Sequence, residues 1–269
     1  MRDIPSQALL PLVYRMLQLL AIMNPTWPAP AEHPPLGPTE AHIWAVPLDA
    51  TISPLNSHAA IFSPEERQRA DLFRLDAPRQ RFVIARAALR ILLSRYLGVT
   101  PAELAITVNA YNKPRLADEQ HATGLRFNVA HSGNLALVAI TYGCEIGVDV
   151  ERLRTVRHAE HIAQRYFHPS EIEAILAAPY RDAAFMRCWT GKEAVLKAIG
   201  TGITGSLADF QVPINDAQDR GAWINAPRTS TGQFARCWVR RLDVGGDFAA
   251  AVAVVGSERN VRCMATPAQ

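Results

Sequence analysis

Hydrophobic and polar residues alternate in blocks along the chain, and each block predicts one secondary-structure element. β-Branched and aromatic residues dominate residues 42–48, which is typical of a strand. An arginine-rich helix is predicted to begin after Ser63, where an N-cap residue precedes a proline and two acids, and to continue towards Leu75. Apolar residues then recur at three- and four-residue spacing over residues 78–97, which predicts a longer helix that Gly98 ends.

The order of predicted elements then repeats in the second half of the chain. After the long helix we expect three strands, and then again one strand, two short helices, one long helix and three strands. The predicted ranges are 104–111, 125–130 and 135–142 for the first three strands, 145–151 for the next strand, 158–167, 169–178 and 182–199 for the helices, and 209–213, 234–242 and 248–255 for the last strands.

This repeated order predicts an α+β fold with two similar α/β subdomains related by pseudo-twofold symmetry. Each subdomain is expected to be a small, mostly antiparallel sheet with a long helix packed on it, with a ligand cleft between the two. We divide the chain into an N-terminal extension with a Pro-rich linker (1–41), an N-terminal subdomain (42–145) and a C-terminal subdomain (146–269). The linker is predicted from six prolines between residues 24 and 38, which forbid a regular helix.

Composition narrows the class of protein. A hydrophobic content of 49% predicts a packed core, and a net charge of +3 gives only a slight preference for anionic partners. The arginines between residues 67 and 95 could form a surface that binds nucleic acid. The low net charge disfavours this interpretation, and we expect no nucleic-acid partner. The 4 cysteines lie far apart, as expected for reduced thiols in a cytoplasmic protein.

The apolar segment 8–23 is the best candidate for a membrane-associated element. Pro11, Arg15 and Gln18 interrupt it, so we expect no membrane span. A signal peptide is the alternative, which Asp3 and the lack of a clean cleavage site disfavour.

The first candidate site is the segment Gly147-Val148-Asp149-Val150-Glu151. Side chains two apart on a strand project from the same face, so Asp149 and Glu151 form a carboxylate pair while the valines point into a core. A solvated pair of acids on an edge strand is the alternative interpretation.

The second candidate site is the helical segment 189–200, Trp-Thr-Gly-Lys-Glu-Ala-Val-Leu-Lys-Ala-Ile-Gly. Trp189, Glu193 and Lys197 lie four residues apart and share one helix face, whereas Lys192 points off it. A surface Glu–Lys pair beside a packed tryptophan would give the same pattern. Together, however, the two segments supply three carboxylates, the hard oxygen ligands that Mg²⁺ prefers.

These two segments closely resemble the signature motifs of 4′-phosphopantetheinyl transferases. The resemblance covers roughly residues 42–255 and extends to Asn112-Lys113-Pro114 and to the segment 127–132, Phe-Asn-Val-Ala-His-Ser. Ala130 departs from the usual serine, which puts one hydroxyl contact to coenzyme A in doubt. The doubled architecture is similar to the long, Sfp-like branch of the family, in which one chain forms both halves, and so implies a monomer.

The resemblance implies transfer of the phosphopantetheine arm of coenzyme A to a serine of an acyl or peptidyl carrier protein, with release of 3′,5′-ADP. By resemblance, Asp149, Glu151 and Glu193 hold Mg²⁺, Glu193 also takes the serine proton, and Lys197 stabilises developing negative charge. The resemblance also places Lys113 and His131, through their motifs, near the phosphates of coenzyme A. We take Arg69, Arg81 and Arg86 as candidates for the 3′-phosphate and adenine end. A buried core histidine and solvated arginines are the alternatives for these residues, and a non-catalytic coenzyme A or nucleotide-binding protein is the alternative function.

Overall fold

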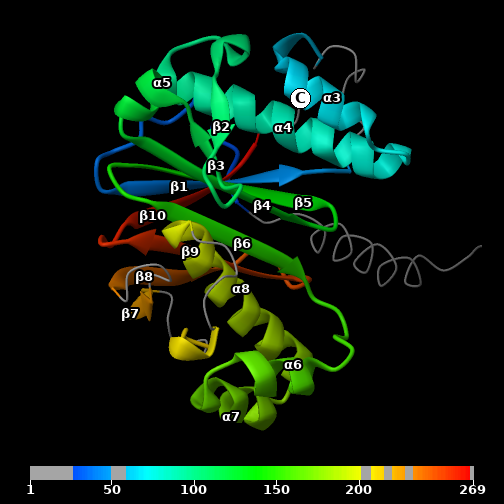
Figure 1. The fold of residues 1–269 in the computed structure, drawn as a ribbon, viewed down its shortest axis with the longest axis vertical. Coiled ribbons are helices and arrows are strands. Elements are labelled where there is room, and N and C mark those ends of the chain that lie inside the picture. Colours follow the sequence, from blue (N-terminus) through cyan, green and yellow to red (C-terminus); the bar gives the residue numbers. More distant parts are fainter. Residues whose placement is uncertain (1–26, 50–58, 201–206, 215–219, 228–232, 267–269) are drawn as a thin grey trace, which may run out of the picture.

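Two four-stranded sheets and two long helices form the body of the molecule (Figure 1). The computed structural model describes residues 27–49, 59–200, 207–214, 220–227 and 233–266. The first sheet has the strand order β10-β1-β5-β4 and the second has the order β6-β9-β8-β7, and a short β2-β3 hairpin stands apart from both. All pairs are antiparallel except β1 with β10, so the predicted fold class is confirmed.

The described helices and strands follow the predicted order closely. Their bounds are β1 Glu40–Pro47, α3 Pro64–Asp71, α4 Asp76–Leu97, β2 Ile106–Val108, β3 Pro114–Leu116, α5 Asp118–Ala122, β4 Leu125–Ser132, β5 Leu135–Tyr142, β6 Ile146–Arg152, α6 Ala159–Tyr166, α7 Pro169–Ala177, α8 Arg181–Ile199, β7 Ala222–Pro227, β8 Phe234–Leu242, β9 Phe248–Val255 and β10 Asn260–Ala265, with single 3-10 turns at Ala59–Ile61, Pro101–Glu103 and Leu207–Asp209.

Three layers of apolar contact hold the elements together. In β1, Trp44 and Val46 face α4, whereas Ile43 and Ala45 face the second sheet, as the period-two geometry of a strand requires. The helices α6, α7 and α8 pack on the outer face of the second sheet. The result is a helix–sheet–sheet–helix stack in which the central strands β1, β5 and β9 are buried almost throughout.

Two predicted strands differ in the structure. Over 104–111 the chain forms only the short β2, because the Asn109 side chain accepts the N–H groups of Tyr111 and Lys113 and turns the chain back into β3. The predicted strand 209–213 is wrong. There the N–H of Val212 bonds to Glu171 Oε1 at 2.7 Å and Pro213 has no N–H to donate, so the strand of this sheet is β7 instead.

The last described strand crosses from one half to the other. β10 pairs in parallel with β1, from Glu40 opposite Asn260 to Ala45 opposite Ala265. β10 is therefore an edge strand of the first sheet, although it comes after all the strands of the second sheet. The division of the chain at residue 145 stays a prediction.

Residues 27–39 contain no helix or strand, as their prolines predict, and they pack on the body. Trp27 Nε1 donates to the carbonyl of Asp243 at 2.6 Å, and the His33 ring stacks on Trp44 with centroids 5.6 Å apart. The predicted apolar segment 8–23 lies outside the described residues. Within the described ranges, no helix combines the length and the apolar character that crossing a membrane requires.

Candidate active site

Strand β6 carries the first two candidate acids and lies against helix α8. Gly147 allows this approach: a Cβ there would lie 2.1 Å from the carbonyl oxygen of Ala194 and 2.3 Å from the backbone nitrogen of Ala198. Val148 and Val150 are buried between the sheets, as predicted. Asp149 is only 4% exposed, so it is not the solvated edge acid of the alternative interpretation.

Helix α8 presents Glu193 and Lys197 towards β6. Trp189 packs with Phe167 and Phe185, with ring centroids 6.4 and 6.2 Å apart, in agreement with a structural role. Gly191 makes room for Val212, whose nearest side-chain atom would lie 3.1 Å from a Cβ. The glycine inside the helix is therefore explained by close packing.

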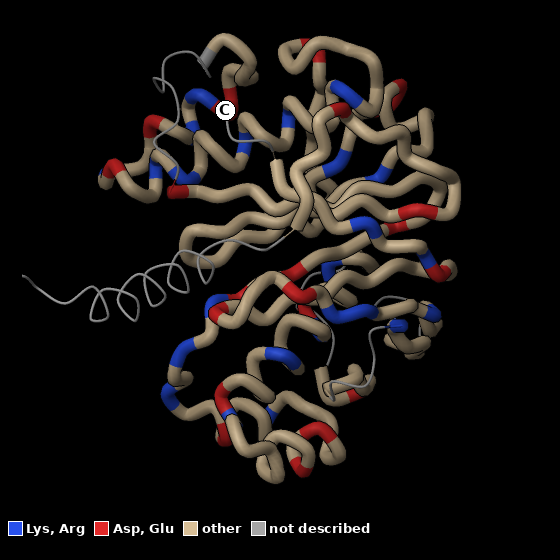
Figure 2. Tube along the Cα trace, turned by 180° about the vertical axis from the view of Figure 1, so that it is seen from behind, with Lys and Arg blue, Asp and Glu red and all other residues tan. Residues whose placement is uncertain are grey.

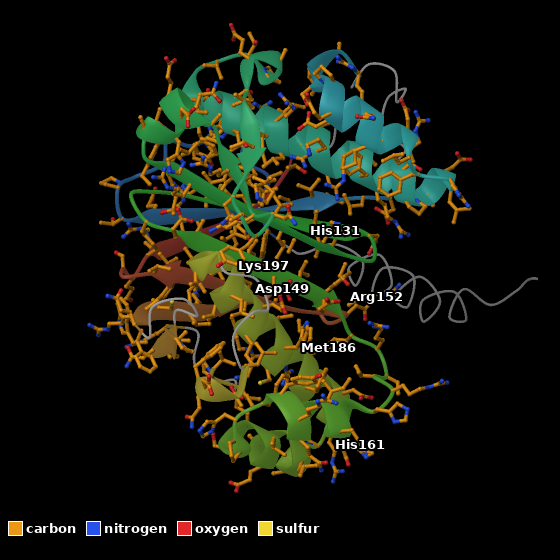
Figure 3. The ribbon with its side chains drawn as sticks, in the orientation of Figure 1. His131, Asp149, Arg152, His161, Met186 and Lys197 are labelled. Carbon is orange, nitrogen blue, oxygen red and sulfur yellow. The ribbon has the colours of Figure 1, made fainter. Side chains whose placement is uncertain are left out.

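The acids of β6 meet the polar face of α8 at the junction of the two halves. Lys197 Nζ lies 2.6 Å from Asp149 Oδ1 (Figure 3). The charges of Glu193 and Glu151 both raise the pKa of Asp149, and Glu151 also raises the pKa of Glu193. Three carboxyl groups thus share one electrostatic environment, in which the Lys197 ammonium is the counter-charge of Asp149 and Glu193.

Burial dominates the ionisation of Asp149 and Glu193. It raises the pKa of Asp149 to about 7, against the opposing charge of Lys197. Burial likewise raises the pKa of Glu193, and again Lys197 opposes the shift. The charged forms of both acids are therefore costly in the folded chain and favour an added cation.

The donor set fits a hard divalent cation. Asp149 Oδ2 and Glu193 Oε1 are buried without a hydrogen-bond partner, and oxygen is the ligand atom that Mg²⁺ prefers. As the side chains stand, no three His, Cys, Asp or Glu residues in the described ranges lie close enough to hold a metal ion. The Mg²⁺ site therefore stays a prediction.

His131 lies at the same junction, at the end of β4 (Figure 3). It is exposed, so it is not the buried core histidine of the alternative. Its pKa is lowered by desolvation first and then by the charge of Lys197, while Glu151 raises it and Arg81 lowers it. His131 and Arg81 thus belong to the electrostatic surroundings of the acids.

The other two arginines cluster on α3 and α4. The guanidinium groups of Arg69 and Arg86 lie 5.7 and 5.9 Å from the centroid of the Phe82 ring. Arg86 Nε also lies 3.5 Å from Glu66 Oε1. The other carboxylate oxygen of Glu66 accepts a hydrogen bond from the buried Arg90 at 2.6 Å. Their contact with coenzyme A stays a prediction.

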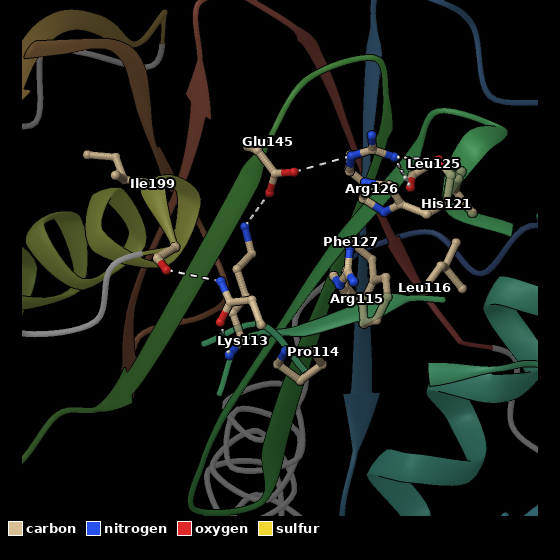
Figure 4. A pocket seen from close by; sticks show the side chains of 12 residues that line it. Lys113, Pro114, Arg115, Leu116, His121, Leu125, Arg126, Phe127, Glu145 and Ile199 are labelled. Atoms are coloured by element: carbon tan, nitrogen blue, oxygen red, sulfur yellow. Dashed lines mark hydrogen bonds and ion pairs between the residues drawn. The ribbon is translucent and has the colours of Figure 1, made fainter. Parts of the chain in front are cut away.

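Lys113 directly precedes β3 and lines a cavity of about 290 Å³ (Figure 4). Its Nζ donates to Glu145 Oε2 at 2.6 Å and to the carbonyl of Ala198 at 3.2 Å. Glu145 also lies 3.2 Å from Arg126. The charge of Lys113 is therefore compensated within the protein, and its role at a phosphate stays a prediction.

Two sets of polar residues were not singled out from the sequence. Lys192 is fully buried, bonds the carbonyls of Leu207 and Phe210 at 2.6 Å each, and pairs with Glu171 at 2.8 Å. Ser132 donates to Glu151 Oε2 at 2.8 Å. In the sequence, Lys192 could have been found because it points off the helix face that Trp189, Glu193 and Lys197 share. Ser132 could have been found because it ends the motif over residues 127–132.

Acidic and basic positions are mixed over both halves, in keeping with the small net charge (Figure 2). The fold and the site together define a protein in which the buried Asp149, the half-buried Glu151 and Glu193, and Lys197 lie at the junction of two similar halves. Residues 145–253 match the model of the 4′-phosphopantetheinyl transferase superfamily, and residues 49–142 match the 4′-phosphopantetheinyl transferase N-terminal model.

Two curated relatives agree with these matches. The 4′-phosphopantetheinyl transferase HetI of Nostoc sp. is 40% identical over 66% of this chain and 76% of its own length. The 4′-phosphopantetheinyl transferase Sfp of Bacillus subtilis is 25% identical over 72% of this chain and 82% of its own length. The chain belongs to the 4′-phosphopantetheinyl transferase superfamily, and the predicted family and enzyme class are confirmed.

Proposed function

We propose that the junction of Asp149, Glu151 and Glu193 transfers the 4′-phosphopantetheine of coenzyme A to a serine of an acyl or peptidyl carrier protein. The observation that supports the assignment is that Asp149 of β6 and Glu193 of α8 both interact with Lys197 and are both affected by the charge of Glu151. In this reaction the serine oxygen forms a bond to the β-phosphorus, the bond from that phosphorus to 3′,5′-ADP breaks, and the serine proton leaves.

The three carboxylates are the proposed ligands of Mg²⁺. When bound, the ion neutralises charge on the pyrophosphate and on the leaving group. Asp149 is held by the strand and by Lys197, and Glu193 is held by a helix whose preceding turn carries Trp189, packed on Phe185. Both acids are thus fixed before substrate arrives, which is what electrostatic preorganisation requires.

Glu193 is the proposed proton acceptor for the carrier serine. Burial raises its pKa, which makes its carboxylate a better base than an exposed glutamate. Lys197 is placed to stabilise negative charge as the phosphorus–oxygen bond breaks. Because Lys197 bonds Asp149, its ammonium is oriented rather than freely rotating.

The outer contacts of coenzyme A are proposed to come from the N-terminal half. His131 and Lys113 would bind phosphate oxygens, while Arg69, Arg81 and Arg86 would bind the 3′-phosphate and adenine end. Exposure of Arg69 and Arg81 supports a role at the surface. Ala130 is buried between the sheets, so a methyl group packs at the position where the family usually has a hydroxyl.

Both halves belong to one chain, so we propose that it works as a monomer. We also propose that it works in the cytoplasm, in keeping with its four widely spaced free cysteines. The acceptor would be a carrier domain of fatty-acid, polyketide or nonribosomal-peptide synthesis. A small acidic carrier domain suits the slight excess of positive charge on the chain.

Incubating apo carrier domains with the chain, coenzyme A and Mg²⁺ is expected to add the phosphopantetheine mass to the carrier. Intact mass spectrometry measures the gain, and omitting Mg²⁺ or adding a chelator is expected to abolish it. A carrier serine replaced by alanine is the matched control. Calorimetric binding of coenzyme A with no mass gain on any carrier would contradict transfer and favour the non-catalytic alternative.

A further inference from the structure

The two halves meet where β4 lies beside β6, although these strands belong to different sheets. Side chains of β4 make the connection at alternate positions. Asn128 Oδ1 accepts the N–H of Val148 at 2.9 Å, and Ser132 Oγ accepts the N–H of Arg152 at 3.1 Å. The spacing of four on β4 matches the spacing of four on β6, so the two strands are held in a fixed register.

Ser132 makes a second bond that Asn128 does not make. Its hydroxyl donates to Glu151 Oε2 at 2.8 Å. A serine hydroxyl has a single proton to donate, so this proton is committed to the carboxylate. At the same time the bond from the Arg152 N–H fixes the position of the oxygen. One side chain of the first half thereby joins the backbone and the acid of the second half.

We propose that Ser132 is a positioning residue that orients Glu151 for cation binding. The inference rests on the proposed function, because it takes Glu151 as a metal ligand. The hydrogen bond engages Oε2 and sets the direction in which Oε1 points. Residues that hydrogen-bond a metal-ligating carboxylate raise the affinity of the site, and their loss typically costs about 10- to 100-fold in metal affinity or activity. The affinity of the site thus depends on the contact between the two halves.

Ser132→Ala removes both bonds, whereas Ser132→Thr keeps a hydroxyl on a β-branched side chain that a strand accommodates. We expect the alanine variant to need about tenfold more Mg²⁺ for half-maximal transfer, and the threonine variant to stay within about threefold of the unmodified chain. The second measurement is the binding of Mn²⁺ in the presence of coenzyme A and without carrier protein. The electron paramagnetic resonance signal of free Mn²⁺ monitors this binding. The same rise in the dissociation constant is expected for Ser132→Ala.

Ser94→Ala is the matched control for loss of a buried hydroxyl. Ser94 Oγ donates to the carbonyl of Ile91 at 2.9 Å within α4 and makes no described contact with the three acids. The Ser94→Ala variant is expected to have a changed thermal stability but the same dissociation constant for Mn²⁺ as the unmodified chain.

A Ser132→Ala variant that binds Mn²⁺ within twofold of the unmodified chain would overturn the inference, even if its melting temperature fell. The proposed function fails in a different way. If the unmodified chain moves no phosphopantetheine, that function is wrong, while the Mn²⁺ titration still decides whether Ser132 acts on the acid cluster.

Discussion

Replacing Glu193 with glutamine is expected to lower phosphopantetheine transfer by at least about a thousandfold, because it removes both a proton acceptor and a proposed metal ligand. Glutamine keeps the size of the side chain, so the packing of α8 is preserved. Burial raises the pKa of Glu193 in the folded chain, which means that its ionised form disfavours folding at neutral pH. The neutral variant should therefore be at least as stable as the unmodified chain without metal.

Initial rates with an apo carrier protein measure the loss, and thermal unfolding measures the stability. Glu173→Gln is the matched control, since Glu173 lies exposed on α7 away from the acid cluster. It is expected to leave the rate unchanged. Undiminished transfer by a folded Glu193→Gln variant would remove Glu193 from the proposed chemistry.

Replacing Gly147 with alanine is expected to destabilise the chain by about 3 kcal/mol, because the added methyl group overlaps the backbone of α8. A Cβ at this position lies 2.1 Å from the Ala194 carbonyl oxygen. Because that oxygen belongs to the backbone, neither a change of rotamer nor the movement of a flexible side chain can relieve the overlap. The helix and β6 must move apart, and that movement separates Glu193 and Lys197 from Asp149. Transfer should therefore fall even in the fraction that remains folded.

Urea unfolding gives the loss of stability from the shift of the midpoint. Gly246→Ala is the control, because Gly246 lies in the turn before β9 with nothing within 4 Å of an added Cβ. It is expected to be neutral or slightly stabilising, by up to about 1 kcal/mol. Equal midpoints for the two variants would contradict the close packing of β6 on α8.

The sequence predicts the long elements well because their signals are local. Gly98 and Gly200 end α4 and α8 in the left-handed conformation, at φ values of 68° and 78°. The Ser63 capping box is also present, although the helix that it starts ends at Asp71 rather than near Leu75. Capping residues and helical periodicity thus sufficed for these elements.

The errors arise where a partner distant in sequence decides the structure. Residues 210 and 212 alternate with polar neighbours as in a strand, yet both are buried against the helices of the second half, and a glutamate side chain takes the Val212 N–H. β10 has its partner in β1, at the other end of the chain, so no local pattern reveals the crossing. Similarly, the buried pair of Lys192 with Glu171 depends on the packing of α7 on α8.

The candidate site could be placed from the sequence only as two separate segments. Period two on β6 and the four-residue spacing on α8 fix which side chains share a face. Whether the two faces meet depends on Gly147 and on the burial of both elements, which the structure shows. The link from Ser132 to Glu151 required coordinates, because a serine in a strand gives no sign of its partner.

A crystal structure with coenzyme A and Mn²⁺, with anomalous scattering used to locate the metal, tests the central claim most directly. We predict one anomalous peak beside the pyrophosphate, coordinated by carboxylate oxygens of Asp149, Glu151 and Glu193. Bound coenzyme A with its metal peak remote from Glu193, or held by neither acid of β6, would contradict the account.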